Sequence, residues 1–122
     1  MKVLVIEPGK YPEEKEIAGS LEDMQRLVGG NIQVIYPFPE EVVLVCNEEG
    51  KLQGLPLNRA LRNAEGKVYD IISGTFFLCA APADSENFES LTEEHLKKYS
   101  DLFRSPEVFL NLGGQIICLL AL

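Results

Sequence analysis

The segment from Asn47 to Phe77 holds the residues of this chain whose types and spacing could do chemistry. It places Asn58, Arg59 and Arg62 within one short polar run, in a protein with a formal net charge of −8. If this run is helical, the two arginines lie three residues apart on one face. Two guanidinium groups there could bind a phosphate or carboxylate through bidentate hydrogen bonds. Asn58 could add a further hydrogen-bond donor or cap the turn. The run therefore predicts a site for a small anionic ligand.

A surface ion-pair network is the alternative to a ligand site. The segment is electrically neutral, with four basic and four acidic residues, so the whole net charge lies outside it. The arginines could simply pair with the acidic residues of the same segment, which are Glu48, Glu49, Glu65 and Asp70. The sequence leaves both interpretations open.

Tyr69 and Asp70 come just before the apolar stretch at the end of this segment. A tyrosine hydroxyl beside a carboxylate could bind a ribose or another polar ligand. Alternatively, Tyr69 packs at a sheet edge and Asp70 pairs with an arginine. We include both residues in the candidate ligand site, whose members are Asn58, Arg59, Arg62, Tyr69 and Asp70.

The remaining reactive residue types form no recognisable catalytic or metal-binding set. His95 is the single histidine, and we expect it to be solvated on a helix. Cys46, Cys79 and Cys118 each lie in an apolar run without metal-ligand spacing, which is typical of buried thiols in a reducing compartment. Neither Gly-Gly pair has the sequence of a phosphate-binding loop. We therefore expect no catalytic residues, no metal and no cofactor, and we favour a binding protein over an enzyme.

Size and charge limit the classes of partner. A chain of 122 residues is expected to form one domain, residues 1–122. An acidic protein with a pI near 4.6 would be repelled by nucleic acid and by anionic membranes. The N-terminal run MKVLVIEPG lacks the pattern of a signal peptide, and no apolar run approaches the length of a membrane span. We expect a cytoplasmic protein.

Two helices are expected from local signals. Ser20 followed by two acids is typical of a helix N-terminus, and Gly29-Gly30 would end that helix. The second helix is expected to begin at the capping box from Ser90 to Glu93 and to end before Pro106.

Strands are expected where short apolar runs are bounded by turn residues. The run KVLVI at residues 2–6 lacks alternation, which favours a central strand buried on both faces. The segment at residues 57–62 is expected to be a helical turn or a loop. Further strands are expected at residues 15–17, 31–38, 41–46, 51–55, 68–80 and 115–122. Together these elements predict an α+β fold with a mostly antiparallel sheet of about six strands.

Four motifs of the chain resemble a known family. The segments MKVLVIEPG, IQVIYPF, VCNEEGKLQGLPLNRAL and YDIISGTFF are similar to the domain of unknown function family numbered 3846. The resemblance covers nearly the whole chain and is densest from Cys46 to Phe77. It implies a small protein of phages and of conjugative or integrated elements, chiefly in Gram-positive bacteria. It brings no activity with it.

These considerations give a leading functional hypothesis and two alternatives. The hypothesis is a non-enzymatic protein of phage or mobile-element origin that binds a small anionic ligand in the host cytoplasm. An anti-defence protein that sequesters a nucleotide-derived signal would fit this description. The alternatives are an acidic protein–protein interaction module that inhibits or decoys a host protein, and a small nucleotide-acting enzyme. The sequence also leaves room for a homo-oligomer.

Overall fold

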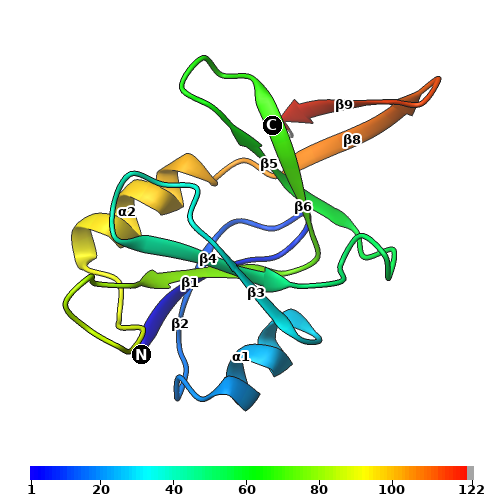
Figure 1. Cartoon of the computed structure of the whole chain (residues 1–122). Coiled ribbons are helices and arrows are strands. Elements are labelled where there is room, and N and C mark those ends of the chain that lie inside the picture. The colour runs from blue at the N-terminus through cyan, green and yellow to red at the C-terminus, as the bar shows by residue number, and fades with distance from the viewer. Residues whose placement is uncertain (121–122) are drawn as a thin grey trace.

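A central antiparallel sheet forms the body of the protein (Figure 1), as seen in a computed structural model that describes residues 1–120. Its strands follow the spatial order β2–β1–β7–β4–β3. Their bounds are β1 (Lys2–Ile6), β2 (Glu13–Glu16), β3 (Ile32–Ile35), β4 (Val42–Asn47) and β7 (Phe76–Ala80). The described residues also form two further hairpins and two helices. The predicted α+β fold is therefore confirmed, with nine strands in the described residues where about six were expected.

The three inner strands are apolar on both faces because both faces of the sheet are covered. Along β1, Leu4 and Ile6 point into one core and Val3 and Val5 into the other. This arrangement explains the unbroken apolar run of β1, which the sequence correctly placed at an inner position of the sheet.

Helix α1 (Leu21–Val28) covers one face of the sheet, and its ends are those that the sequence predicted. The Ser20 side chain accepts a hydrogen bond from the backbone N of Asp23 at 3.1 Å. At the other end, Gly29 adopts a φ of 80° and donates to the Gln25 carbonyl. Met24 and Val28 face the core.

Helix α2 (Glu93–Leu102) covers the opposite face and begins later than expected. The N-cap is Thr92, whose hydroxyl accepts from the backbone N of His95 at 3.1 Å. The expected capping box at Ser90 is wrong, because the Ser90 hydroxyl accepts from the backbone N of Lys2 instead. Neither helix of residues 1–120 is long and apolar enough to cross a membrane.

Strands β5 (Leu57–Arg62) and β6 (Val68–Ser73) form a two-stranded sheet that is separate from the central sheet. The expectation of a helical turn or loop at residues 57–62 is therefore wrong, because this segment pairs with β6. The strand expected at residues 51–55 is also wrong: these residues turn, with Leu55 donating to the Gly50 carbonyl. The long run at residues 68–80 divides into β6 and β7, which belong to different sheets.

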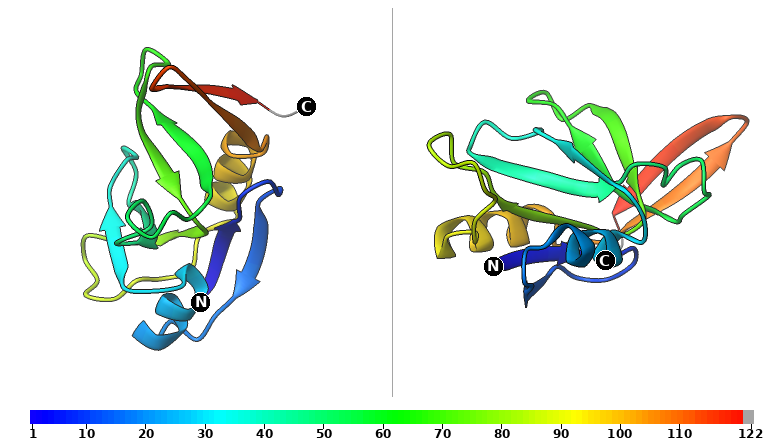
Figure 2. Two further views of the ribbon diagram at one scale, coloured as in Figure 1. Left: turned by 90° about the vertical axis from the view of Figure 1, so that its right-hand side faces the viewer. Right: turned by 60° about the horizontal axis from the view of Figure 1, so that its bottom comes forward.

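The C-terminal hairpin, which we call the arm, consists of β8 (Glu107–Leu112) and β9 (Gln115–Leu120). It projects from the body beside β5 (Figures 1 and 2). Gly113 and Gly114 turn the chain, both at positive φ. The expected final strand forms as β9, but its apolar sequence, which is typical of a buried strand, is not buried here: most of its side chains are exposed. The last two positions of that expected strand lie outside the described residues.

Candidate functional site

A cavity of about 340 Å³ lies between β5, the C-terminal end of α2 and the base of the arm. We call it the arginine pocket. Three of the five expected site residues line it: Arg59, Arg62 and Tyr69. Its other lining residues are Pro37, Phe38, Ala60, Leu61, Asp101, Leu102, Phe103, Ser105, Glu107 and Leu120.

The two arginines reach one pocket by a route different from the helical spacing that the sequence suggested. In a regular strand, residues three apart point to opposite faces. The pairing of β5 with β6 is irregular between Leu61 and Arg62, where the register shifts. The shift skips Tyr69 on β6, so β5 itself runs without interruption from Arg59 to Arg62. All four of these consecutive residues line the pocket, which is therefore not confined to one face of β5.

Arg59 is the most deeply buried charged residue of the pocket, with an exposed fraction of 1%. Its Nε donates to the Phe103 carbonyl at 3.1 Å, and Nη2 donates to the Lys10 carbonyl at 2.6 Å. Nη1 donates to the side-chain oxygen of Asn58 at 2.9 Å. Burial lowers the pKa of the Arg59 guanidinium, while the nearby Glu107 carboxylate acts in the opposite direction. Arg59 thus ties three separate segments together and remains charged.

Asn58 lies behind the arginine pocket and has no exposed surface. Its amide nitrogen donates to the carbonyls of Ile6 and Gly74, each at 2.9 Å. Its amide oxygen accepts from Arg59. The structure therefore places Asn58 where it positions Arg59 and joins β5 to the central sheet, rather than on the pocket surface.

Arg62 forms an ion pair that the sequence did not indicate. Its Nη2 lies 2.5 Å from Oε1 of Glu107, whose Oε2 accepts from the backbone N of Ala60 at 2.7 Å. The Glu107 side chain is 2% exposed and that of Arg62 is 36% exposed. Nothing in the local sequence of Glu107 reveals this contact, because Arg62 lies 45 positions earlier. The expected pairing of Arg62 with an acid of its own segment is not formed.

Aromatic and apolar side chains form the rest of the wall. Phe38 and Phe103 pack edge to face, with ring centroids 6.1 Å apart. Tyr69 stands at the mouth and is 56% exposed. The pocket therefore combines aromatic and aliphatic walls with guanidinium groups, an arrangement suited to a ligand with a ring and an anionic group.

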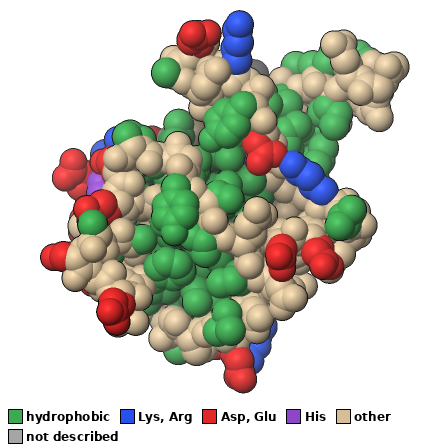
Figure 3. Space-filling model, viewed as in Figure 1, with side chains coloured by type: hydrophobic (Ala, Val, Ile, Leu, Met, Phe, Trp, Pro, Cys, Tyr) green, Lys and Arg blue, Asp and Glu red, His purple; other side chains and the backbone are tan. Residues whose placement is uncertain are grey.

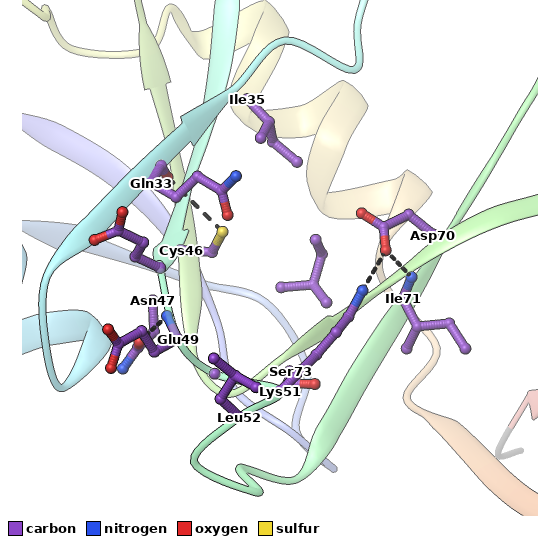
Figure 4. Close-up of a pocket in the computed structure, with 13 residues that line it drawn as sticks. Gln33, Ile35, Cys46, Asn47, Glu49, Lys51, Leu52, Asp70, Ile71 and Ser73 are labelled. Atoms are coloured by element: carbon purple, nitrogen blue, oxygen red, sulfur yellow. Dashed lines mark hydrogen bonds and ion pairs between the residues drawn. The ribbon is translucent and has the colours of Figure 1, made fainter.

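Asp70, the fifth expected residue, lines a different cavity of about 130 Å³ (Figure 4), which we call the Lys51 pocket. The pairing with β5 skips Tyr69, and the two adjacent residues line different cavities. Asp70 Oδ1 lies 2.6 Å from Lys51 Nζ and also accepts from the backbone N of Ile71. Its ion-pair partner is thus a lysine, not an arginine. The buried Ser73 hydroxyl at this pocket has no hydrogen-bond partner among residues 1–120.

A cluster around Glu40 corrects the expectation for His95. His95 is not simply solvated, because its Nε2 lies 2.7 Å from Oε2 of Glu40. Oε1 of Glu40 accepts from Lys98 Nζ at 2.6 Å and makes a very short hydrogen bond with the Tyr99 hydroxyl. These hydrogen bonds, that of Lys98 first, lower the pKa of Glu40 to about 2. Burial and the neighbouring carboxylate raise the pKa of Tyr99. The cluster ties the β3–β4 connection to α2.

The cysteines show no sign of an activated thiol. Cys46 and Cys79 are buried, and Cys118 is partly buried. Burial raises the pKa of Cys79 to about 12, and it also raises the pKa values of Cys46 and Cys118. A thiol with a raised pKa is a poor nucleophile at neutral pH. Within the described part of the chain, no three His, Cys, Asp or Glu side chains are grouped in a way that could hold a metal ion.

Comparison with known proteins places the chain in a family but gives it no activity. A family model described as a domain of unknown function matches residues 1–104. Searches of curated proteins and of solved structures gave no match. The match includes the central sheet, both helices and the β5–β6 hairpin, whereas the arm follows it. The chain therefore belongs to the family of the domain of unknown function DUF3846.

Proposed function

We propose that this protein is a non-enzymatic binding protein that takes up a small anionic ligand in the arginine pocket. The observation that carries the proposal is the environment of Arg59. Its guanidinium is buried, and the residues that the structure describes offer it carbonyl and amide oxygens but no directly bonded carboxylate. Four hydrogen bonds use four of its five N–H groups.

The charge balance of the pocket supports an anion as its ligand. Glu107 pairs directly with Arg62, so these two charges largely offset one another. The charge of Arg59 is left without a contacting carboxylate in a wall that excludes much of the water. Electrostatic attraction is stronger in such surroundings than in bulk water. A phosphate or carboxylate entering the pocket would therefore be attracted to Arg59, and it could also contact the exposed part of Arg62.

The size and the lining of the pocket narrow the class of ligand. A volume of about 340 Å³ lies at the lower end of the range of roughly 300–1,000 Å³ that is usual for small-molecule sites. Tyr69 at the mouth and Phe38 and Phe103 in the wall offer surfaces for a planar ring. The ligand that fits both features is a nucleotide-derived molecule of about one nucleotide unit. In a phage or mobile-element protein, such binding would sequester a host defence signal in the bacterial cytoplasm.

Calorimetry and thermal unfolding with a panel of nucleotides test this function. The panel comprises nucleoside monophosphates, cyclic mononucleotides and ADP-ribose. A ligand kept at 100 times its Kd stabilises the folded state by about 2.7 kcal/mol. Arg62→Gln should weaken binding by roughly tenfold, because it removes a charge-assisted hydrogen bond at the pocket surface. Arg26→Gln, on exposed α1, is the matched control and should bind normally.

Two outcomes would overturn the proposal. One is the absence of any binding or stabilisation with the whole panel at millimolar concentration. The other is binding that Arg62→Gln and Arg26→Gln reduce equally. Product analysis of the same mixtures distinguishes storage of the ligand from its turnover, which the proposal excludes.

The net charge of −8 favours a second candidate, an acidic surface that binds a basic host protein. Acidic side chains lie at many points around the visible face in Figure 3, without a dominant cluster. Capture of a host protein that weakens with salt but is unaffected by Arg62→Gln would support this candidate instead.

A further inference from the structure

The Glu107 carboxylate lies in the arginine pocket in the way that a bound anion would. One oxygen contacts the Arg62 guanidinium at 2.5 Å, and the other accepts from the backbone N of Ala60 at 2.7 Å. Guanidinium groups and backbone N–H groups both form charge-assisted hydrogen bonds with carboxylate and phosphate oxygens. The pocket therefore contains a formed anion position with two donors, which is filled by a side chain of the protein itself.

The donors and the anion come from different parts of the chain. Ala60 and Arg62 lie on β5, within the residues that the family model matches, whereas Glu107 is the first residue of the arm and follows the match, which ends at residue 104. Glu107 also lies close enough to Arg59 to oppose the lowering of its pKa by burial. The family domain thus supplies an anion position that is attractive to both arginines, and the arm supplies the carboxylate that fills it.

We propose that the anionic group of the ligand binds where the Glu107 carboxylate lies, so that the arm competes with the ligand for Arg62 and the Ala60 N–H. This inference rests on the proposed function, because it assigns the anion of the ligand to named atoms of the same pocket. Full binding then requires the release of Glu107, which makes the arm a negative regulator of the site.

This competition favours a ligand with a terminal phosphate. A phosphate monoester carries a charge of about −1.5 to −2 at neutral pH and has three terminal oxygens, whereas a carboxylate has one charge and two oxygens. The monoester can take over both hydrogen bonds, and it is attracted to Arg59 and Arg62 more strongly than the carboxylate is. A phosphodiester has a single charge and lacks this advantage. We therefore expect nucleoside monophosphates to bind more tightly than cyclic mononucleotides.

The arm is built so that its attachment depends on Glu107. Within residues 107–120, Glu107 is the one buried residue, and the others are partly or fully exposed. Leu120, at the other end of the arm, also lines the pocket but is 58% exposed. A two-stranded hairpin is marginally stable by itself, and segments with few buried contacts open at low free-energy cost. Release of Glu107 therefore leaves little else to hold the arm against the body.

Glu107 is also the acid that controls access to Arg62. Asp101, the other acidic residue of the pocket, accepts from Lys97 Nζ at 2.9 Å, so its charge is already paired. A site that is open in only a fraction of the molecules binds its ligand more weakly by that fraction. Glu107→Gln keeps the shape of the side chain but removes its charge, so it should tighten the binding of nucleoside monophosphates by at least about tenfold.

Calorimetry with nucleoside monophosphates and cyclic mononucleotides measures this gain. Glu65→Gln, on the exposed turn between β5 and β6, changes the net charge equally and should bind as the native protein does. Binding that appears only in Glu107→Gln would support the inference as well, because it shows a site closed by the arm. Equal affinities of the two variants would overturn the inference while leaving the proposed function intact. No binding to the native protein or to Glu107→Gln would overturn both.

Hydrogen exchange of the arm amides separates displacement of Glu107 from simple charge repulsion. If the ligand replaces Glu107, saturating nucleoside monophosphate should speed the exchange of residues 108–120 several-fold while the central sheet stays protected. Glu107→Gln should speed the same amides without any ligand. Arm exchange that is unchanged or slower in the liganded native protein would overturn the inference, even where Glu107→Gln binds more tightly. The native protein alone gives this result, so it stands even if the variant does not fold.

Discussion

Arg62 on β5 and Glu107 at the start of β8 form the ion pair that anchors the arm to the domain. Nη2 and Oε1 lie 2.5 Å apart, and the same carboxylate accepts from the backbone N of Ala60. The two side chains differ in exposure, because Glu107 is almost fully buried while part of Arg62 reaches solvent. The pair therefore joins the family domain to an element that lies beyond the matched residues.

Replacing Glu107 by alanine should destabilise the protein by about 2–3 kcal/mol. The change leaves a buried backbone N–H and one side of the Arg62 guanidinium without an acceptor. This loss of stability is smaller than that expected on breaking a fully buried ion pair, because water can hydrate the exposed part of Arg62 in the variant. Denaturant unfolding measures it, and Glu14→Ala on the exposed edge strand β2 is the control, with a change within about 0.5 kcal/mol. Equal effects of the two substitutions would contradict this account.

Arg59→Met should cost about 3–5 kcal/mol, more than the loss of any exposed arginine. It removes the hydrogen bonds to the carbonyls of Lys10 and Phe103 and leaves the Asn58 amide oxygen unpaired. Arg59→Lys should recover only part of the loss, because a lysine cannot reproduce the planar set of donors. The free energy of unfolding is again the measurement. Arg26→Met, at an exposed pair on α1, should change it by less than about 1 kcal/mol.

Glu40→Gln should remove the stabilising contribution of the Glu40 carboxylate, which is present at neutral pH and lost in acid. The pKa of Glu40 in the folded state is lowered to about 2, chiefly by the hydrogen bond from Lys98. A lowered pKa means that the contribution is complete above the unfolded value of 4.5 and disappears as the pH falls towards 2. The native protein should therefore lose its advantage over the variant between about pH 5 and pH 2. Thermal midpoints recorded across this range test the direction, with Glu41→Gln as the exposed neighbouring control.

Local signals predicted those parts of the fold that local contacts determine. Helix α1 is the clearest case, because the Ser20 cap and the Gly29 ending act within a few residues of the helix. The unbroken apolar run of β1 correctly indicated burial on both faces. In contrast, the Ser90 capping box failed because a competing contact with Lys2, 88 positions away, determines the role of that serine.

The candidate site was predictable in composition but not in arrangement. Leu57 and Leu61 have helical spacing, and only the pairing with β6 makes their segment a strand. The partner of Arg62 lies 45 positions away, so no local pattern could identify it. Tyr69, which the pairing with β5 skips, and Asp70 line different cavities, although the two are adjacent in sequence. The residue types were therefore informative, whereas the contacts required the tertiary structure.

Gly74→Ala should destabilise the protein more than Gly66→Ala, although both glycines have the same φ of 80°. A Cβ at residue 66 meets no atom within 4 Å, so this control reports the strain of positive φ alone, about 1 kcal/mol. A Cβ at residue 74 would lie 2.7 Å from Cδ1 and 3.4 Å from Cβ of Leu55, which should add roughly 1–2 kcal/mol. In a Leu55→Ala background the cost of Gly74→Ala should fall to that of Gly66→Ala. A double-mutant cycle on unfolding free energies measures this coupling. Additive effects would show that contact with Leu55 is not the cause of the extra cost of Gly74→Ala.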